Sequence, residues 1–126
     1  MRIFELMSAF ILGGSSYVMI ELLYRGHSHI SMAIAGGISF LILHMLFSRY
    51  PEMSMLVQCA AGLVVISSIE LLFGVIVNIY LKLGVWDYSN QKFNLWGQVC
   101  LRYSLYWAVL TVPIAYISKL LHAMFA

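Results

Sequence analysis

A carboxylate in the middle of an apolar stretch is the feature of this sequence that points most directly to chemistry. Glu70 lies well inside the apolar residues 55–81, and the next basic residue along the chain is Lys82. A charged side chain near the centre of a bilayer costs upwards of about 2.5 kcal/mol, so Glu70 needs a polar partner from another helix or a proton of its own. Asn78 follows on the same helical face. We expect Glu70 and Asn78 to line an ion or substrate pathway, although a hydrogen-bonded carboxyl that only fixes helix register fits the same position.

Other ionisable side chains near the ends of apolar stretches are candidates for the same pathway. Glu21 and Arg25 are four residues apart, the spacing at which a helix pairs a carboxylate with a guanidinium. This pair either belongs to a gate or anchors a helix end at the membrane interface. His44 is expected to hydrogen-bond within the bundle. The candidate partners of Glu70 from other helices are Arg25, Arg102, His44 and Tyr106.

The sequence contains no recognisable motif for a metal site, a cofactor or catalysis. His27 and His29 flank one serine, but a zinc site needs three or four ligands, and no further Cys or His clusters with them in the sequence. Cys59 and Cys100 begin antiparallel stretches, so they are expected on opposite faces of the membrane. The chain has no nucleotide-binding glycine motif and suggests no Ser-His-Asp triad. We therefore expect no enzyme activity, no metal and no cofactor.

The composition places these residues in a membrane. Of the 126 residues, 63% are hydrophobic and 10% are charged, whereas a soluble domain has about 45–50% and about 25%. The formal net charge is +2 and there is no basic run, which argues against a nucleic-acid partner. The lipid bilayer is the expected partner, because so apolar a chain would expose too much hydrophobic surface to water.

Four apolar stretches are long enough to cross a bilayer, which takes roughly 20 residues. They comprise residues 3–24, 30–47, 55–81 and 95–121. Hydrocarbon leaves no water to satisfy the backbone, so the expected fold is all-α. It would be a single transmembrane domain, residues 1–126, with about four helices arranged as two hairpins. The run IELLY at 20–24 recurs as IELLF at 69–73, which fits an internal repeat of the hairpin.

The least apolar segment, VWDYSNQKFNLWGQ, occupies residues 85–98 between the last two stretches. It is longer than a minimal turn needs, so we expect a structured cap over one end of the bundle. The ends of the first and third stretches share this face, which places the cap near Glu21 and Arg25. An ordinary interfacial hairpin is the alternative.

Specific roles follow for the cap. Its members are Trp86, Asp87, Tyr88, Ser89 and Asn94. Trp86 and Trp96 are expected at one membrane depth, because tryptophans settle at the headgroup level. Asp87 is expected to accept hydrogen bonds near the start of the last helix and to compete with Glu21 for Arg25. Asn94 is expected to be the N-cap of the last helix.

Small side chains line one face of the last stretch, and they predict close helix packing in lipid. These residues are Gly97, Ser104, Ala108, Thr111, Ala115 and Ser118. The seam is long for one short bundle. We expect it to contact a helix of the same chain or of a second subunit, and we expect a homo-oligomer or a complex with other membrane subunits.

The loop segment also carries a family resemblance. WDYS at 86–89, FN at 93–94 and Gly97 resemble the signature of the CmpB-like ABC-transporter permease family of bacterial membrane proteins. Glu70 and the upstream residues Glu21, Arg25 and Gly26 are similar to that family as well, whereas RGHSHIS at 25–31 departs from its pattern. The likeness covers roughly residues 10–110. It implies transport and a location in the bacterial cytoplasmic membrane.

Together these features predict a small integral membrane transport or channel subunit, with Glu70 as the intramembrane site for an ion, proton or substrate. The small size and balanced charges also fit a dual-topology small exporter. If the polar and small side chains on one face of each helix serve only to join the helices, the protein would be a non-transporting scaffold or accessory protein. A lipid-acting intramembrane enzyme ranks last, and the small-molecule or ion substrate stays unspecified.

Overall fold

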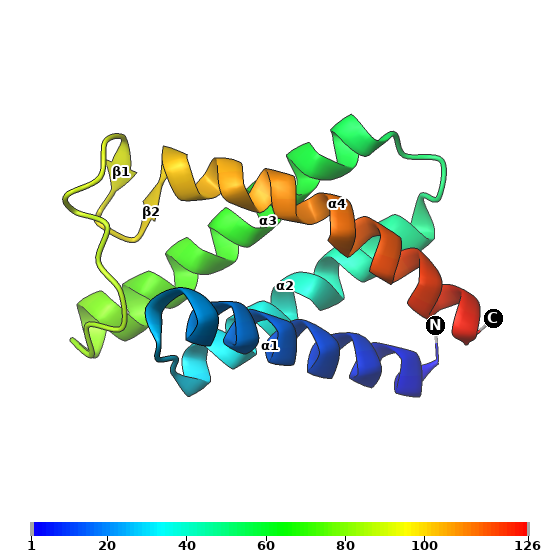
Figure 1. Cartoon of the computed structure of the whole chain (residues 1–126), viewed down its shortest axis with the longest axis horizontal. Helices are drawn as coiled ribbons and strands as arrows, with labels where there is room; N and C mark the ends of the chain where they lie inside the picture. Colours follow the sequence, from blue (N-terminus) through cyan, green and yellow to red (C-terminus); the bar gives the residue numbers. More distant parts are fainter. Residues whose placement is uncertain (1, 126) are drawn as a thin grey trace.

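The computed structural model describes residues 2–125, and within them four long helices carry most of the regular structure (Figure 1). They are α1 (Ile3–Arg25), α2 (Ile30–Arg49), α3 (Met55–Gly74) and α4 (Leu101–Met124). A π-helical continuation, η1 (Val75–Tyr80), extends α3. Each helix, α3 taken with η1, is long and apolar enough to cross a membrane. The expected all-α polytopic membrane fold is therefore confirmed, and the chain is an integral membrane protein.

The outer surface of the bundle is apolar, as a lipid-facing surface must be. Leu56 is 82% exposed, Leu23 81% and Val109 71%. In water such side chains would form an unfavourable continuous patch, whereas hydrocarbon solvates them.

The helices pair in sequence order. α1 packs along α2 and α3 packs along α4, while α2 contacts both α3 and α4. Both chain ends lie together at one end of the bundle, and the segment between α3 and α4 lies at the opposite end (Figure 1). The buried apolar cluster where α2, α3 and α4 meet comprises Leu43, Phe47, Ile66, Trp107 and Ala115. We call the two ends the termini end and the loop end.

Glycines allow the helices of each hairpin to approach closely. A Cβ atom on Gly13 of α1 would lie 2.4 Å from the Cβ of Phe40 in α2. A Cβ on Gly62 of α3 would lie 1.7 Å from the hydroxyl of Thr111 in α4. Any side chain larger than hydrogen would therefore force these helices apart, which explains the glycines at these contacts.

The small-residue seam of α4 packs within this single chain. Thr111, Ala115 and Ser118 are buried, and Ser104 hydrogen-bonds to Ser67 of α3 with 2.8 Å between the hydroxyls. Gly97 lies outside the helix, in a turn with φ of +71°. The seam therefore contacts a helix of the same chain, which is one of the two expected arrangements. Oligomerisation stays a prediction.

Local signals set the helix boundaries. Gly26 adopts the left-handed conformation at φ of +79°, and its N–H donates to the Leu22 carbonyl, which ends α1. The ring of His29 accepts a hydrogen bond from the Ser31 backbone and so caps α2. The Ser54 hydroxyl caps α3 in the same manner.

The last helix begins at Leu101, not at residue 95 as the hydrophobicity predicts. Instead, β1 (Asn94–Leu95) and β2 (Val99–Cys100) pair as a short antiparallel ribbon. Trp96 and Gly97 between them have positive φ, a conformation that a right-handed helix cannot contain. The prediction that Asn94 caps this helix is therefore wrong, because Cys100 occupies the N-cap position.

Candidate functional site

Glu70 lies on α3 with only 5% of its surface exposed, and two donors from other elements reach it. The indole N–H of Trp107 in α4 points to one carboxyl oxygen at 3.4 Å. The hydroxyl of Tyr88 in the loop donates to the other oxygen at 3.1 Å. Burial and contact with another span agree with the expectation from sequence, but the four partners expected there are not the ones found. Trp107 was overlooked because an indole donor is usually counted as an apolar residue.

Tyr88 comes from the loop rather than from a helix, so the loop itself completes the surroundings of Glu70. Its phenol is half-buried. Burial first, and the neighbouring Glu70 carboxylate second, raise the pKa of the Tyr88 phenol above its ordinary value. The phenol therefore keeps its proton at physiological pH and remains a hydrogen-bond donor to Glu70.

Asn78 fixes the loop that delivers Tyr88. Its side-chain carbonyl accepts a hydrogen bond from the Val85 backbone at 2.7 Å, and its amide donates to the Gln98 side chain at 2.8 Å. The Trp86 indole donates to the Gln98 carbonyl at 3.0 Å. The structure places Asn78 as a clamp between η1 and the two ends of the loop, and its expected role in a pathway stays a prediction.

The loop is a structured cap, although several of its side chains act differently from the expectation. Asp87 accepts from the backbone N–H of Ser89 at 2.9 Å, which forms a local turn and does not contact the start of α4. Asn94 accepts from Gly97 N–H at 3.0 Å and so closes the turn of the ribbon. Trp86 is buried at 5% exposure, whereas Trp96 is 67% exposed, so the two indoles have different surroundings, and their common membrane depth stays a prediction.

Glu21 and Arg25 form the expected ion pair within α1, with 2.7 Å between the carboxylate and the Nε atom. Side-chain exposure is 22% for Arg25 and 12% for Glu21. The Nη2 atom of Arg25 is buried and has no hydrogen-bond partner within residues 2–125. Asp87 does not compete for Arg25, because it is engaged in its own turn with Ser89.

A pocket of about 230 Å³ opens beside this ion pair, between the loop ends of α1 and α4. Glu21, Arg25 and Tyr88 line it together with Trp107, so both donors to Glu70 belong to its wall. The cap therefore lies close to the ion pair, as expected. Glu21, Arg25, Glu70 and the loop meet at one end of the bundle.

A tyrosine cluster forms the remaining wall of this pocket. The rings of Tyr88 and Tyr103 stack at 4.8 Å between centroids, and the Tyr103 and Tyr24 hydroxyls hydrogen-bond at 3.1 Å. Arg102 donates to the Tyr106 hydroxyl at 2.9 Å. Such walls present phenol groups and aromatic faces, which suit ligands that combine polar and apolar parts.

A second, apolar pocket of about 170 Å³ adjoins the first one deeper in the bundle. Ile20, Trp107 and Leu110 line both pockets. The remaining walls of the second pocket come from all the long helices and are almost entirely apolar. The two pockets together form a space that is polar at the loop end and apolar toward the middle of the bundle.

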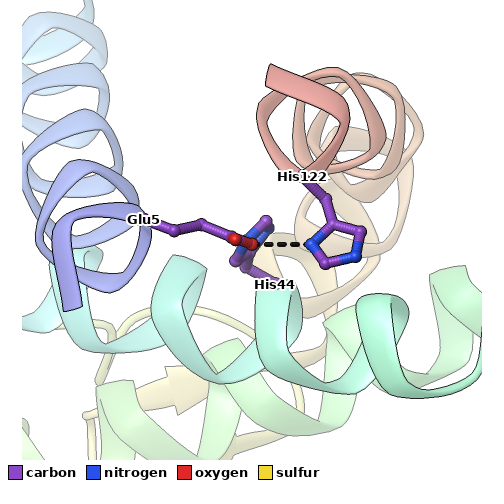
Figure 2. A group of neighbouring side chains, drawn as sticks. All are labelled: Glu5, His44 and His122. Carbon is purple, nitrogen blue, oxygen red and sulfur yellow. Dashed lines mark hydrogen bonds and ion pairs between the residues drawn. The ribbon is translucent and has the colours of Figure 1, made fainter. Parts of the chain in front are cut away.

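His44 does not belong to this site. It is fully buried at the termini end, where its Nε2 atom lies 2.6 Å from a carboxylate oxygen of Glu5. The same oxygen lies 2.8 Å from Nδ1 of His122 (Figure 2). Since α2 runs antiparallel to α1 and α3, His44 lies at the opposite end of the bundle from Glu70, and its expected place in a pathway stays a prediction.

Sequence reasoning missed Glu5 and His122, and with them a group of three potential metal ligands. A usable signal was present, because an even number of spans brings both chain ends and the end of the second span to one face. The pair that the sequence suggests, His27 and His29, lies at the loop end of the bundle and does not belong to this group.

Comparison with known proteins agrees with the resemblance seen in the loop. Residues 8–126 match the model of a family described as "Putative ABC-transporter type IV". Neither the curated proteins nor the solved structures include a significant match to the chain.

Proposed function

Since the chain belongs to the family described as "Putative ABC-transporter type IV", we propose that it is a membrane subunit of a transport system. The proposed pathway is the pair of pockets between α1 and α4. Glu70 is the proposed protonatable group, and it lies behind the wall of the pathway, where it contacts the lining residues Tyr88 and Trp107. We further propose that it works in the bacterial cytoplasmic membrane as a homo-oligomer or beside other membrane subunits, because one small bundle encloses little space. In this proposal the protein moves its substrate without catalysing a reaction.

The adjoining pockets are the observation that carries this proposal. The pocket beside Arg25 offers a guanidinium, a carboxylate and phenols, and the pocket beside it is apolar. A substrate that fits both would have a polar group at the loop end and an apolar part toward the bundle centre. Arg25 supports a polar group that accepts hydrogen bonds, because its buried Nη2 atom has no acceptor within the described part of the chain.

Glu70 couples this space to a proton in the following way. While the carboxylate is charged, it accepts hydrogen bonds from Tyr88 and Trp107 and holds the loop against the bundle. When Glu70 takes up a proton, it becomes a weaker acceptor, and its hold on Tyr88 weakens. The loop then moves away from the pocket that Tyr88 helps to line. Proton uptake at Glu70 would thereby open the pocket at the loop end.

Proton flux in reconstituted vesicles tests the proposal. Purified protein is inserted into vesicles that contain a pH-sensitive dye, and a membrane potential is imposed. We expect wild-type vesicles to change internal pH faster than empty vesicles. Glu70→Gln should remove this difference, whereas Glu52→Gln, a change of an exposed carboxylate in the hinge after α2, should retain it. Wild-type flux equal to that of empty vesicles, or full flux in Glu70→Gln, would contradict the proposal.

A scaffold or accessory role is the second candidate, and one observation favours it. Polar side chains inside the bundle satisfy one another, as in the Ser67–Ser104 pair and in the two donors to Glu70. Such contacts join helices without any transport. Under this role, Glu70→Gln would lower the stability of the protein. Vesicles with the wild type or with any variant would show the same flux as empty vesicles.

A further inference from the structure

We propose that Glu5, His44 and His122 bind a divalent transition-metal ion of the zinc class at the termini end of the bundle. The three side chains come from α1, α2 and α4, which are far apart in sequence. One ligand atom from each lies within 4.8 Å of the others. The site lies at the opposite end of the bundle from Glu70, so its occupation does not depend on the proposed transport.

The geometry requires only a small adjustment to hold an ion. Glu5 now bridges both histidines, with distances of 2.6 Å to His44 and 2.8 Å to His122 (Figure 2). Zinc bonds to imidazole nitrogen and carboxylate oxygen are about 2.0–2.2 Å long, so tetrahedral ligand atoms lie about 3.3–3.6 Å apart. The Glu5 oxygen must therefore separate from each histidine nitrogen by roughly 0.5–1 Å. His122 can move because its side chain is 46% exposed, whereas separation from the buried His44 requires a rotation of the Glu5 side chain.

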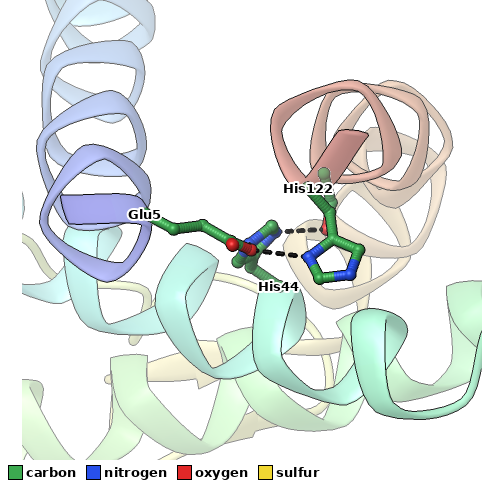
Figure 3. A network of polar contacts seen from close by, with 4 residues as sticks. Glu5, His44 and His122 are labelled. Carbon is green, nitrogen blue, oxygen red and sulfur yellow. Dashed lines mark hydrogen bonds and ion pairs between the residues drawn. The ribbon is translucent and has the colours of Figure 1, made fainter. Parts of the chain in front are cut away.

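An orienting contact supports His44 as a ligand. Its Nδ1 atom lies 2.7 Å from the hydroxyl of Ser118 in α4, and Ser118 is 1% exposed. Figure 3 shows the ring of His44 beside Glu5 and His122. A histidine that binds metal through one ring nitrogen usually donates its other N–H to a fixed acceptor. The Ser118 hydroxyl is such an acceptor, and it leaves Nε2 of His44 directed at the position between Glu5 and His122. The buried imidazole thus has a defined tautomer when metal is bound.

The donor set indicates the class of ion. Two imidazole nitrogens and one carboxylate oxygen suit zinc and neighbouring transition metals, whereas magnesium and calcium prefer oxygen ligands alone. Three protein ligands leave at least one coordination position for water or another small ligand. Neutral imidazoles bind the ion, so any proton held between Glu5 and a histidine is released to solvent when the ion enters.

The ion can approach from the aqueous face. His122 and Ser118 line a pocket of about 320 Å³ that also involves the hinge between α2 and α3. Lys119 shares this pocket, so the pocket itself does not attract cations. The attraction comes from Glu5, whose carboxylate is 3% exposed and has the two histidines as its partners. An ion bound there would tie together the termini ends of α1, α2 and α4.

The other two histidines provide a matched control. His27 and His29 lie at the loop end, and the ring of His29 already accepts a hydrogen bond from Ser31 N–H at 3.1 Å. The double variant His27→Ala/His29→Ala removes as many imidazoles as the site contains, without touching Glu5, His44 or His122. If only variants of Glu5, His44 or His122 lose the metal, and this control keeps it, non-specific binding of metal to histidines is excluded.

Zinc binding to the full chain, purified without a polyhistidine tag and stripped with a chelator, tests the proposal. The zinc content after equilibrium dialysis should be one ion per chain for wild type and for His27→Ala/His29→Ala. His122→Ala and Glu5→Gln should weaken binding by at least about tenfold. Zinc should also raise the unfolding temperature of the wild type and not that of His122→Ala. Equal zinc binding by His122→Ala and wild type, or no zinc bound by wild type, would overturn the proposal.

A spectrum of the wild-type protein keeps the test valid if a variant fails to fold. Cobalt(II) added to the chelator-treated protein should give the visible absorption of a four-coordinate site with nitrogen and oxygen ligands. Absorption identical to cobalt in buffer would show that the three side chains form only a hydrogen-bonded cluster, and the proposal would be wrong.

Discussion

Removing the hydroxyl of Tyr88 probes the contact that connects the loop to the buried acid. Tyr88→Phe deletes the donor that lies 3.1 Å from Glu70, while the ring can keep its stacking on Tyr103. A hydrogen bond to a charged group contributes about 1.5–3 kcal/mol, and one between neutral groups contributes about 0.5–1.5 kcal/mol. We therefore expect Tyr88→Phe to lower the free energy of unfolding by about 1.5–3 kcal/mol where Glu70 is ionised, and by less where it is protonated.

Unfolding of the protein in detergent micelles, followed by tryptophan fluorescence, measures this change. Tyr80→Phe is the matched control, because Tyr80 is 80% exposed at the end of η1. A double-mutant cycle with Glu70→Gln isolates the pair, and groups in direct contact show coupling of about 0.5–3 kcal/mol. The coupling should also shrink when the pH is lowered far enough to protonate Glu70.

Two results would refute this reasoning. Tyr88→Phe and Tyr80→Phe could have the same effect on the free energy of unfolding, or the changes at Tyr88 and Glu70 could add without coupling. Either result would mean that the hydroxyl of Tyr88 does not hold the loop to Glu70, and protonation of Glu70 could not open the pocket through this contact.

Three further outcomes are expected. Gly62→Ala should destabilise the protein by about 1–3 kcal/mol in thermal unfolding, because its Cβ would lie 1.7 Å from the Thr111 hydroxyl; an unchanged unfolding temperature would contradict the α3–α4 packing. Asn78→Ala should speed proteolysis of the loop, because the 2.8 Å bond to Gln98 is lost, and unchanged digestion would argue against the clamp. Above about pH 10 the wild type should lose stability more steeply than Tyr88→Phe, because the unfolded phenol then releases a proton that the folded state retains; parallel pH profiles would argue against the buried phenol.

Hydrophobicity was sufficient to predict the long helices, because a spanning helix satisfies its own backbone whatever its neighbours are. The short hinges between consecutive spans predicted the two hairpins. Hydrophobicity failed at residues 95–100, where Leu95 and Trp96 look like the start of a span. There the positive φ of Trp96 and Gly97 turns the chain into a ribbon. Such a turn depends on side chains such as that of Asn94, whose Oδ1 atom accepts a hydrogen bond from the Gly97 backbone N–H, and hydrophobicity does not report that contact.

The candidate site was predictable only in its charged members. The i, i+4 spacing of Glu21 and Arg25 gives their ion pair directly, and a mid-span acid such as Glu70 must be buried or neutral. The partners of Glu70 depend on how the loop folds back, which no periodicity records. Glu5 and His122 lie 117 positions apart, so their contact follows from the packing of α1 against the end of α4 and not from any motif.

Access of water to the pockets between α1 and α4 tests the central claim most directly. Ile20, which lines both pockets, is changed to cysteine in a protein whose Cys59 and Cys100 are replaced. A membrane-impermeant thiol reagent is then added from the loop face of vesicles, with Val109→Cys as the lipid-exposed control. We expect Ile20→Cys to react much faster than the control, and at a rate that Glu70→Gln changes. Reaction no faster than that of Val109→Cys, from either face, would contradict a pathway at this position.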